Sequence, residues 1–406
     1  MSLIESKADP GQPLTPPAAT SSGARRLDFI DALRGWAFFV VLVFHSGQHV
    51  GNPSLRRMTD LGEFGVQLFY VISAATLFLS MHSRWKRDDR PLFAFFVRRF
   101  FRIAPMFWLA IIFYVWWGGM GPRVWAPNGI SVKDIAVTAA FAHGWQPSQI
   151  NAVVPGGWSV GVEMSFYLLM PALFFTIRTL RHSLWFFGAS VIVCGGLSHF
   201  YHRWLADGWP ADTMYLVNKF TYFWLPAQMP VFALGGVLYF ILQRKEASGA
   251  KFKPALAPAL LGLAVLLACV GSVWTYPVPK QHVAYGIVFV LLAWSLSLRP
   301  FAVLVNPLTR HMGAVSFSGY LSHFFVLDLL SSRLPGLFGN LVPAGGNAEL
   351  CLLVVVALVV TLIISTLTYR LIEIPGQRCG KAFISHLAQR FPLHPGTALP
   401  NLHRDA

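Results

Sequence analysis

Long apolar runs separated by short polar or basic segments dominate the chain. A helix needs about 20 mostly apolar residues to cross the hydrocarbon core of a bilayer. Runs of this kind predict ten transmembrane helices, near residues 27–49, 62–81, 100–118, 158–178, 183–201, 221–242, 256–273, 283–298, 312–332 and 348–373. The fold class predicted is therefore all-α, a polytopic integral membrane bundle of about ten transmembrane helices.

Three segments fall outside this pattern. Residues 1–24 are rich in Pro, Ser, Ala and Gly and have no apolar core, so we expect a disordered N-terminal tail rather than a signal peptide. Residues 381–406 are polar and punctuated by proline, and we expect a tail with little regular structure there. The membrane domain is thus expected at 25–380. The connection 119–157 is too polar at its ends to span, but its segment "IAVTAAFAHGW" predicts a short interfacial or re-entrant helix.

Composition and charge agree with a lipid bilayer as the environment. Of the 406 residues, 55% are hydrophobic and only 12% are charged, whereas soluble proteins carry about 25% charged residues. The net charge of +15 does not indicate nucleic-acid binding, because the basic residues lie in the gaps between apolar runs and not on one soluble face. With the N-terminus inside, 23 of the 32 lysines and arginines fall on the cytoplasmic side and eight on the other. This split predicts that both termini are cytoplasmic.

The first predicted helix carries two polar residues that flank an apolar run. Arg34 and His45 lie on either side of Gly35–Phe44, eleven positions apart. Eleven residues turn an ideal helix through about 1100°, so both side chains leave from nearly the same face, roughly 16 Å apart along the axis. Taken alone, Arg34 is explained either by a salt bridge to Asp31 or by the binding of an anionic substrate. Taken alone, His45 is explained by a position at the membrane–water interface. His45 and His49 lack the neighbouring glutamate of a zinc-protease motif, and the four cysteines lack metal spacing, so no metal site is predicted.

Six blocks, in this order, give the chain a resemblance to a known family. The blocks are "LDFIDALRGWAFFVVLVFHSG", "GEFGVQLFYVISAATLF", "FVRRFFRIAPMFWLA", "GGWSVGVEMSFYLLMPALFF", "SFSGYLSHFFV" and "YRLIEIPGQR". Together they resemble the membrane-bound acyltransferase type 3 family, in a form without a fused SGNH-type domain. The chain departs from the usual family pattern at Gln67, Ala74, Phe107 and Val160.

The resemblance implies an O-acyltransferase of the bacterial inner membrane. The expected donor is acyl-CoA, with acetyl-CoA as the main candidate and no permanently bound cofactor. The expected acceptor is a hydroxyl of a cell-envelope or secreted polysaccharide or of a glycolipid. Transfer of another group such as succinyl, a small lipophilic acceptor, and a transporter of glycans or lipids remain alternatives.

The resemblance also implies roles for residues that the spacing had already singled out. His45 would be the general base, or would form an acyl-histidine, and Glu163 would orient it; Glu163 as a structural partner of an arginine is the alternative. Arg34 would help to bind the anionic end of the donor. The phosphates would be bound by three arginines that a cytoplasmic anchor also explains: Arg98, Arg99 and Arg102. Further substrate or oxyanion candidates are Ser73, Ser159, Tyr167, Tyr320 and His323.

Overall fold

The fold is described from a computed structural model, which describes residues 22–85, 87–247, 254–273, 280–333, 342 and 345–390. In this part of the chain the structure consists of helices and has no β-strand. The first half contains α1 (Ser22–His49), α2 (Pro53–Thr59), α3 (Gly65–Arg84), α4 (Pro91–Gly118), α5 (Val132–Ala139), α6 (Trp158–Thr176) and α7 (Leu180–Ala206). The second half contains α8 (Met214–Phe223), α9 (Leu225–Ala247), α10 (Leu256–Val273), α11 (Gln281–Leu298), α12 (Pro307–Ala314), α13 (Ser316–Asp328), α15 (Asn347–Thr368) and α16 (Ile374–Arg390).

The predicted membrane bundle is confirmed. Nine helical segments of the described residues are long and apolar enough to cross a bilayer, and a tenth results if α12 and the helix after it count as one span. The span predicted near 312–332 begins with a bend, because α12 and the helix after it meet at 82°. The break at Val315 lets α12 lie across α1, where Gly313 approaches the backbone of Asp31.

The last span continues much further than the sequence predicted. Residues Asn347–Arg390 form one helical path of 44 residues, which would extend about 66 Å and therefore projects beyond a hydrocarbon core of about 30 Å. Our expectation of little regular structure after residue 380 is wrong for 381–390. Pro375 does not end this helical path; the π-helical turn Tyr369–Glu373 comes directly before α16 and interrupts the regular α-helical hydrogen-bond pattern there. The rest of the expected tails, 1–21 and 391–406, lies outside the described residues.

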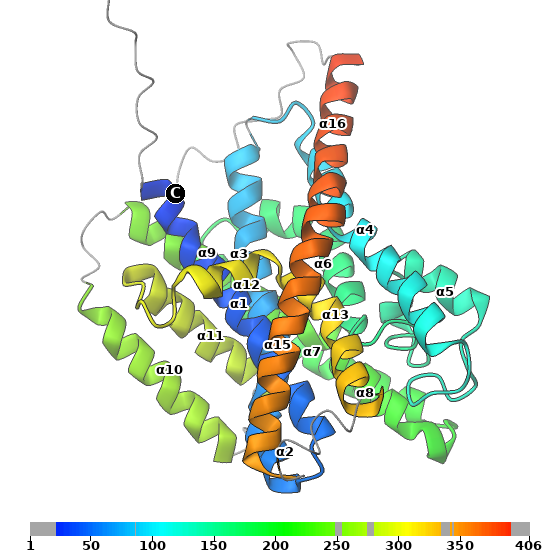
Figure 1. The fold of residues 1–406 in the computed structure, drawn as a ribbon. Helices are drawn as coiled ribbons and strands as arrows, with labels where there is room; N and C mark the ends of the chain where they lie inside the picture. The colour runs from blue at the N-terminus through cyan, green and yellow to red at the C-terminus, as the bar shows by residue number, and fades with distance from the viewer. Residues whose placement is uncertain are drawn as a thin grey trace, which may run out of the picture.

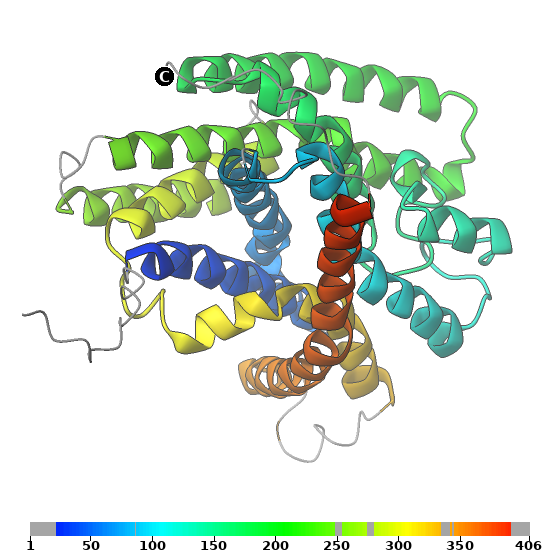
Figure 2. The ribbon, with the colours of Figure 1, turned by 90° about the horizontal axis from the view of Figure 1, so that it is seen from above.

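Helix α1 lies inside the bundle and connects its two halves. It packs against α12, α3 and α13, while α3 packs on α9, α9 on α7, and α13 on α15. Figure 2 shows α3 near the middle of the molecule, with α7 along one edge and the α15–α16 rod on the opposite side. Figure 1 shows α16 rising past the ends of the other helices. Large apolar side chains of α7, such as Trp185, Ile192 and Phe200, stay exposed, as expected for a helix that faces lipid.

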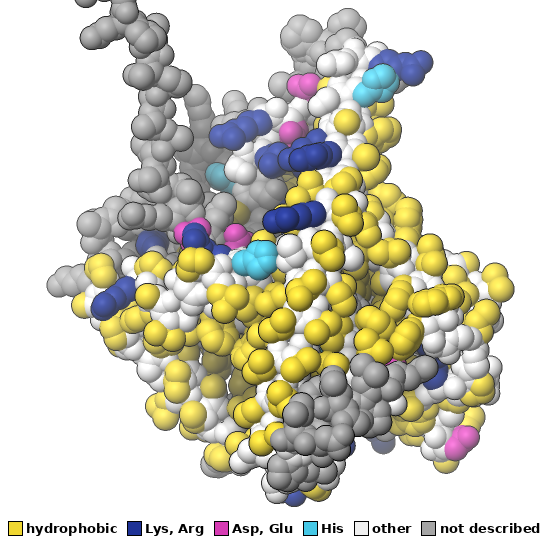
Figure 3. All heavy atoms as spheres, in the orientation of Figure 1, with side chains coloured by type: hydrophobic (Ala, Val, Ile, Leu, Met, Phe, Trp, Pro, Cys, Tyr) yellow, Lys and Arg dark blue, Asp and Glu magenta, His cyan; other side chains and the backbone are white. Residues whose placement is uncertain are grey.

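Charged side chains concentrate at one end of the molecule. Figure 3 shows lysine and arginine side chains around the end where α16 projects, above a broad apolar belt. Exposed residues at this end include Arg84, Arg370, Arg378 and Lys381. This gathering agrees with the charge asymmetry in the sequence, and the cytoplasmic location of both termini stays a prediction.

The connection between α4 and α6 forms the short helix that was predicted there, as α5 followed by the turn His143–Trp145. A capping box between Ser131 and Asp134 begins α5. His143 is buried, and its Nε2 lies 2.9 Å from the carbonyl oxygen of Gly157, just before α6 begins. Its ring stacks on that of Phe107. Burial lowers the pKa of His143, so the imidazole is kept neutral where the connection meets the start of α6.

Candidate functional site

A pocket lies between α1, α3, α4, α6 and α13. It encloses about 690 Å³ of space between the side chains, and this figure includes space that is open to solvent. Its lining residues are Arg34, Val66, Phe69, Tyr70, Ser73, Arg99, Arg102, Ile103, Ser159, Val160, Glu163, Tyr167, Ser316, Phe317 and Tyr320. Candidates from five separate blocks of the sequence therefore share one cavity.

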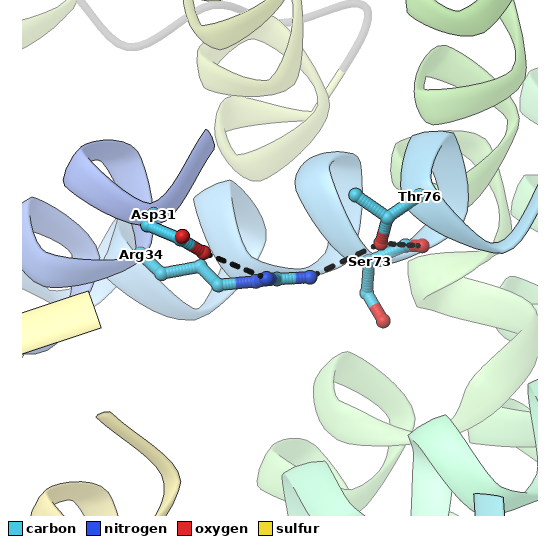
Figure 4. Close-up of polar contacts among 4 residues, drawn as sticks. All are labelled: Asp31, Arg34, Ser73 and Thr76. Carbon is cyan, nitrogen blue, oxygen red and sulfur yellow. Dashed lines mark hydrogen bonds and ion pairs between the residues drawn. The ribbon is translucent and has the colours of Figure 1, made fainter. Parts of the chain in front are cut away.

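Arg34 reaches from α1 to α3 across this pocket. Its Nη1 lies 3.3 Å from a carboxylate oxygen of Asp31, and its Nη2 donates a hydrogen bond of 3.1 Å to the hydroxyl of Thr76. Figure 4 shows the guanidinium stretched between these two groups, with Ser73 one turn from Thr76. The salt bridge to Asp31, which the sequence left as an alternative, is present, and Arg34 lines the pocket as well. The two explanations of Arg34 are therefore compatible.

Glu163 is held by two hydroxyl donors. Its Oε1 accepts hydrogen bonds from the hydroxyl of Ser73 on α3 and from the hydroxyl of Tyr167, the latter at 2.6 Å. The i, i+4 spacing on α6 brings Glu163 and Tyr167 together, as the polar stripe predicted. Ser73 and Tyr167 thus donate to a carboxylate in this arrangement, rather than standing free to bind an oxyanion.

The basic block on α4 is divided by the helix geometry. Arg99 and Arg102 line the pocket, and the guanidinium carbon of Arg99 lies 5.9 Å from the centre of the Tyr167 ring. Arg98 points elsewhere and forms a salt bridge with Asp88. Arg102 forms no hydrogen bond or ion pair with any described residue, and the buried Nε of Arg99 has no partner among them. Arg98 is therefore separated from the pair with which it was predicted to act.

The balance of charges in the pocket favours an anion. Three of the lining side chains carry a guanidinium and one carries a carboxylate; because Arg34 is also paired with Asp31, Arg99 and Arg102 face the single carboxylate of Glu163 and leave an excess of positive charge. Arginines in a partly dry site need a partner for their charge and for their N–H groups. Planar guanidinium groups match carboxylate and phosphate oxygens especially well. The arrangement is suited to an anionic ligand.

Ser159 and Tyr320 form a hydroxyl cluster at the pocket wall. The hydroxyl of Ser159 lies 3.0 Å from the hydroxyl of Tyr320, and both lie 3.0 Å from the carbonyl oxygen of Gly156. Gly156 has a positive φ of 74°, and a side chain there would collide with Tyr320 and Phe324. This turn before α6 therefore fixes α6 against α13.

His45 lies beyond this wall and does not line the pocket. Its ring contacts His323, at 5.3 Å between ring centres, and Phe324, at 4.4 Å. The ring of His323 lies in turn 5.6 Å from that of Tyr320, which does line the pocket. Arg34 thus binds Thr76 of α3, whereas His45 packs against His323 and Phe324 of α13.

The predicted contact between Glu163 and His45 does not form. The carboxylate of Glu163 bonds Ser73 and Tyr167, and the nearest titratable ring to His45 is that of His323. Sequence spacing could relate Glu163 to residues of its own helix, but not to a face of α1. The assignment of Glu163 as the residue that orients His45 is therefore corrected.

Two features of the site were not predicted from the sequence. Thr76 binds Arg34, and the only signal for it was its position one turn after Ser73. Glu373 is buried, and its carboxylate accepts hydrogen bonds from the backbone N–H and the hydroxyl of Ser318 in the first turn of α13. The Glu-x-Pro block near the end of the chain contained Glu373, but gave no sign of which helix it meets.

The family model of the acyltransferase type 3 domain matches residues 27–370, which is most of the chain. The chain belongs to this acyltransferase family. Comparisons with curated proteins and with solved structures returned no match. The match and the helical bundle together identify a multi-pass membrane protein that transfers acyl groups. The acyltransferase carries its arginine pocket and its first-helix histidine on opposite sides of Tyr320 and His323.

Proposed function

We propose that this acyltransferase moves an acetyl group from acetyl-CoA to a hydroxyl of a cell-envelope or secreted polysaccharide, or of a glycolipid. The observation that carries the proposal is the pocket in which Arg34, Arg99 and Arg102 face a single carboxylate. Coenzyme A carries several phosphate oxygens, and guanidinium groups bind such oxygens in a bidentate manner.

The donor would bind with its phosphates at the α4 side of the pocket. Arg102 has no described partner, and Arg99 is held only by aromatic rings, so both are available for phosphate. The pantetheine arm would run between α3 and α6 toward Tyr320. Glu163, held by Ser73 and Tyr167, would balance part of the positive charge and reduce the repulsion among the arginines when no donor is bound.

The transfer itself would take place next to His45. The imidazole of His45 removes the proton from the acceptor hydroxyl while the hydroxyl oxygen attacks the thioester carbonyl. A carbon–oxygen bond forms, the carbon–sulfur bond breaks, and His45 returns the proton to the coenzyme A thiolate. Because the pocket ends at Tyr320, the acyl end has to pass Tyr320 or Phe324 to reach His45, and we expect these side chains to move when the donor binds.

Radiolabelled acetyl-CoA tests the activity. Membranes that contain the protein should incorporate label into the glycan and lipid fraction, and His45→Ala should abolish this incorporation at equal protein amount. A transporter would leave no covalent label. Wild-type incorporation by the His45→Ala variant would refute the role of His45, and absence of label with wild-type protein would refute the proposed donor.

A matched pair of arginine variants tests the donor site. Arg102→Gln removes a pocket guanidinium and should raise the KM for acetyl-CoA by about 10- to 100-fold. This factor corresponds to the loss of one charge-assisted hydrogen bond, which contributes about 1.5–3 kcal/mol. Arg98→Gln removes a positive charge one turn away that is already paired with Asp88, and should leave the KM within about twofold. Equal effects of both variants would contradict a phosphate site at Arg102.

A further inference from the structure

His323 is a buried imidazole with one nitrogen occupied and one nitrogen free. Its side chain is completely buried, and its Nδ1 lies 2.7 Å from the carbonyl oxygen of Tyr320. A carbonyl oxygen only accepts, so Nδ1 carries the hydrogen. Nε2 is buried and has no hydrogen-bond partner among the described residues. A charged imidazole with such a nitrogen would be costly, so Nε2 holds a lone pair that nothing yet uses.

The ring of His45, which can donate an N–H, packs beside that of His323. The ring centres of His45 and His323 are 5.3 Å apart, and Phe324 packs against both rings. Two imidazoles joined by an N–H···N hydrogen bond have centres about 5 Å apart, since each nitrogen lies about 1.1 Å from its ring centre and the hydrogen bond spans about 2.9 Å. The ring separation of His45 and His323 is therefore compatible with such a bond once the two nitrogens face each other.

We propose that His323 is the residue that positions His45, by accepting through Nε2 a hydrogen bond from the His45 imidazole. The proposal rests on the proposed function, in which His45 is the base. It assigns to His323 the task that the sequence had led us to give to Glu163. The bond holds the His45 ring in one orientation and stabilises its positive charge after it has taken the acceptor proton.

The proton balance is unchanged by this assignment. The acceptor O–H bond breaks and an N–H bond forms on the nitrogen of His45 that faces the acceptor, while the N–H on its other nitrogen points to Nε2 of His323. When the thiolate leaves, the proton on the first nitrogen passes to sulfur. His323 stays neutral throughout, and its Nδ1 hydrogen remains on the carbonyl oxygen of Tyr320.

Two amide substitutions separate the two nitrogens of His323. Asn places its amide N–H near the position of Nδ1, so His323→Asn keeps the bond to the Tyr320 carbonyl and removes the acceptor at Nε2. Gln is one carbon longer and places its amide near Nε2, so His323→Gln provides an acceptor oxygen there and loses the bond to Tyr320. A purely structural His323 favours Asn over Gln, whereas a positioning His323 favours Gln over Asn.

The experiment measures the incorporation of radiolabelled acetyl from acetyl-CoA by membranes that contain the full chain, at several donor concentrations and with rates normalised to folded protein. His323→Asn should lower the maximal rate at least 100-fold and His323→Gln about 10-fold, both with a KM for acetyl-CoA within about twofold of wild type. A rate for His323→Asn equal to or above that of His323→Gln overturns the proposal. Wild-type and His45→Ala membranes in the same assay report separately on the proposed function.

Discussion

The close contact between α1 and α12 allows one substitution to be predicted in detail. A Cβ atom at Gly313 would lie 1.8 Å from the carbonyl oxygen of Asp31, and a Cβ atom at Gly35 would lie 2.1 Å from the carbonyl oxygen of Thr309. Both obstacles are backbone atoms, which cannot rotate away as the end of a side chain can. Gly313→Ala therefore forces the two helices apart.

The size of the displacement follows from the geometry. Ordinary contact begins at 3.4 Å, so the backbones must separate by about 1.6 Å at this point. Overpacking of this kind costs about 1–3 kcal/mol of stability. Asp31 lies one turn before Arg34, so a shift of α1 also lengthens the 3.1 Å hydrogen bond from Arg34 to Thr76. A displacement of about 1 Å near a site can lower its activity about 100-fold.

Two measurements test this reasoning on the purified protein. Thermal unfolding in detergent should show a lower melting temperature for Gly313→Ala than for wild type, and the KM for acetyl-CoA should rise. Gly262→Ala is the matched control, because nothing lies within 4 Å of a Cβ at this exposed position on α10. The control should be as stable as wild type or slightly more stable. A Gly313→Ala protein that melts with wild type and keeps its KM would refute the packing argument.

Two further predictions concern groups around the site. Glu373→Leu leaves the N–H and hydroxyl of Ser318 without their acceptor and should lower the stability of the protein by about 1–3 kcal/mol. Glu373→Gln keeps an acceptor oxygen and should lower the stability less. Equal melting temperatures for the two variants would contradict this. Burial lowers the pKa of His143 in the folded protein below its ordinary value of 6.5. As the pH drops below about 6.5, the imidazole is therefore protonated more readily in the unfolded chain than in the folded protein, and the stability of the folded protein should fall. Melting temperatures between pH 8 and pH 5 should show this fall, and His143→Gln should reduce it.

The sequence by itself determined the membrane bundle and the chemical types in its site. Apolar runs of bilayer length depend only on local composition, and helical periodicity relates residues of the same helix. For this reason the spacing of Arg34 and His45 on α1 and the pairing of Glu163 with Tyr167 on α6 follow from the chain alone. The same periodicity could not predict the bend between α12 and α13, because Gly313 meets a backbone carbonyl that is distant in sequence.

Only the tertiary structure decided which faces meet. It pairs Arg98 with Asp88 and leaves Arg102 in the pocket, and it places His323 beside His45 while Glu163 bonds Ser73. The physical reason is that lipid and protein interior are similarly apolar, so hydrophobicity reveals which segments enter the membrane but not which side of a helix faces another helix. Those choices come from close backbone approaches and from the need of each buried polar group for a partner, and both are properties of the assembled bundle.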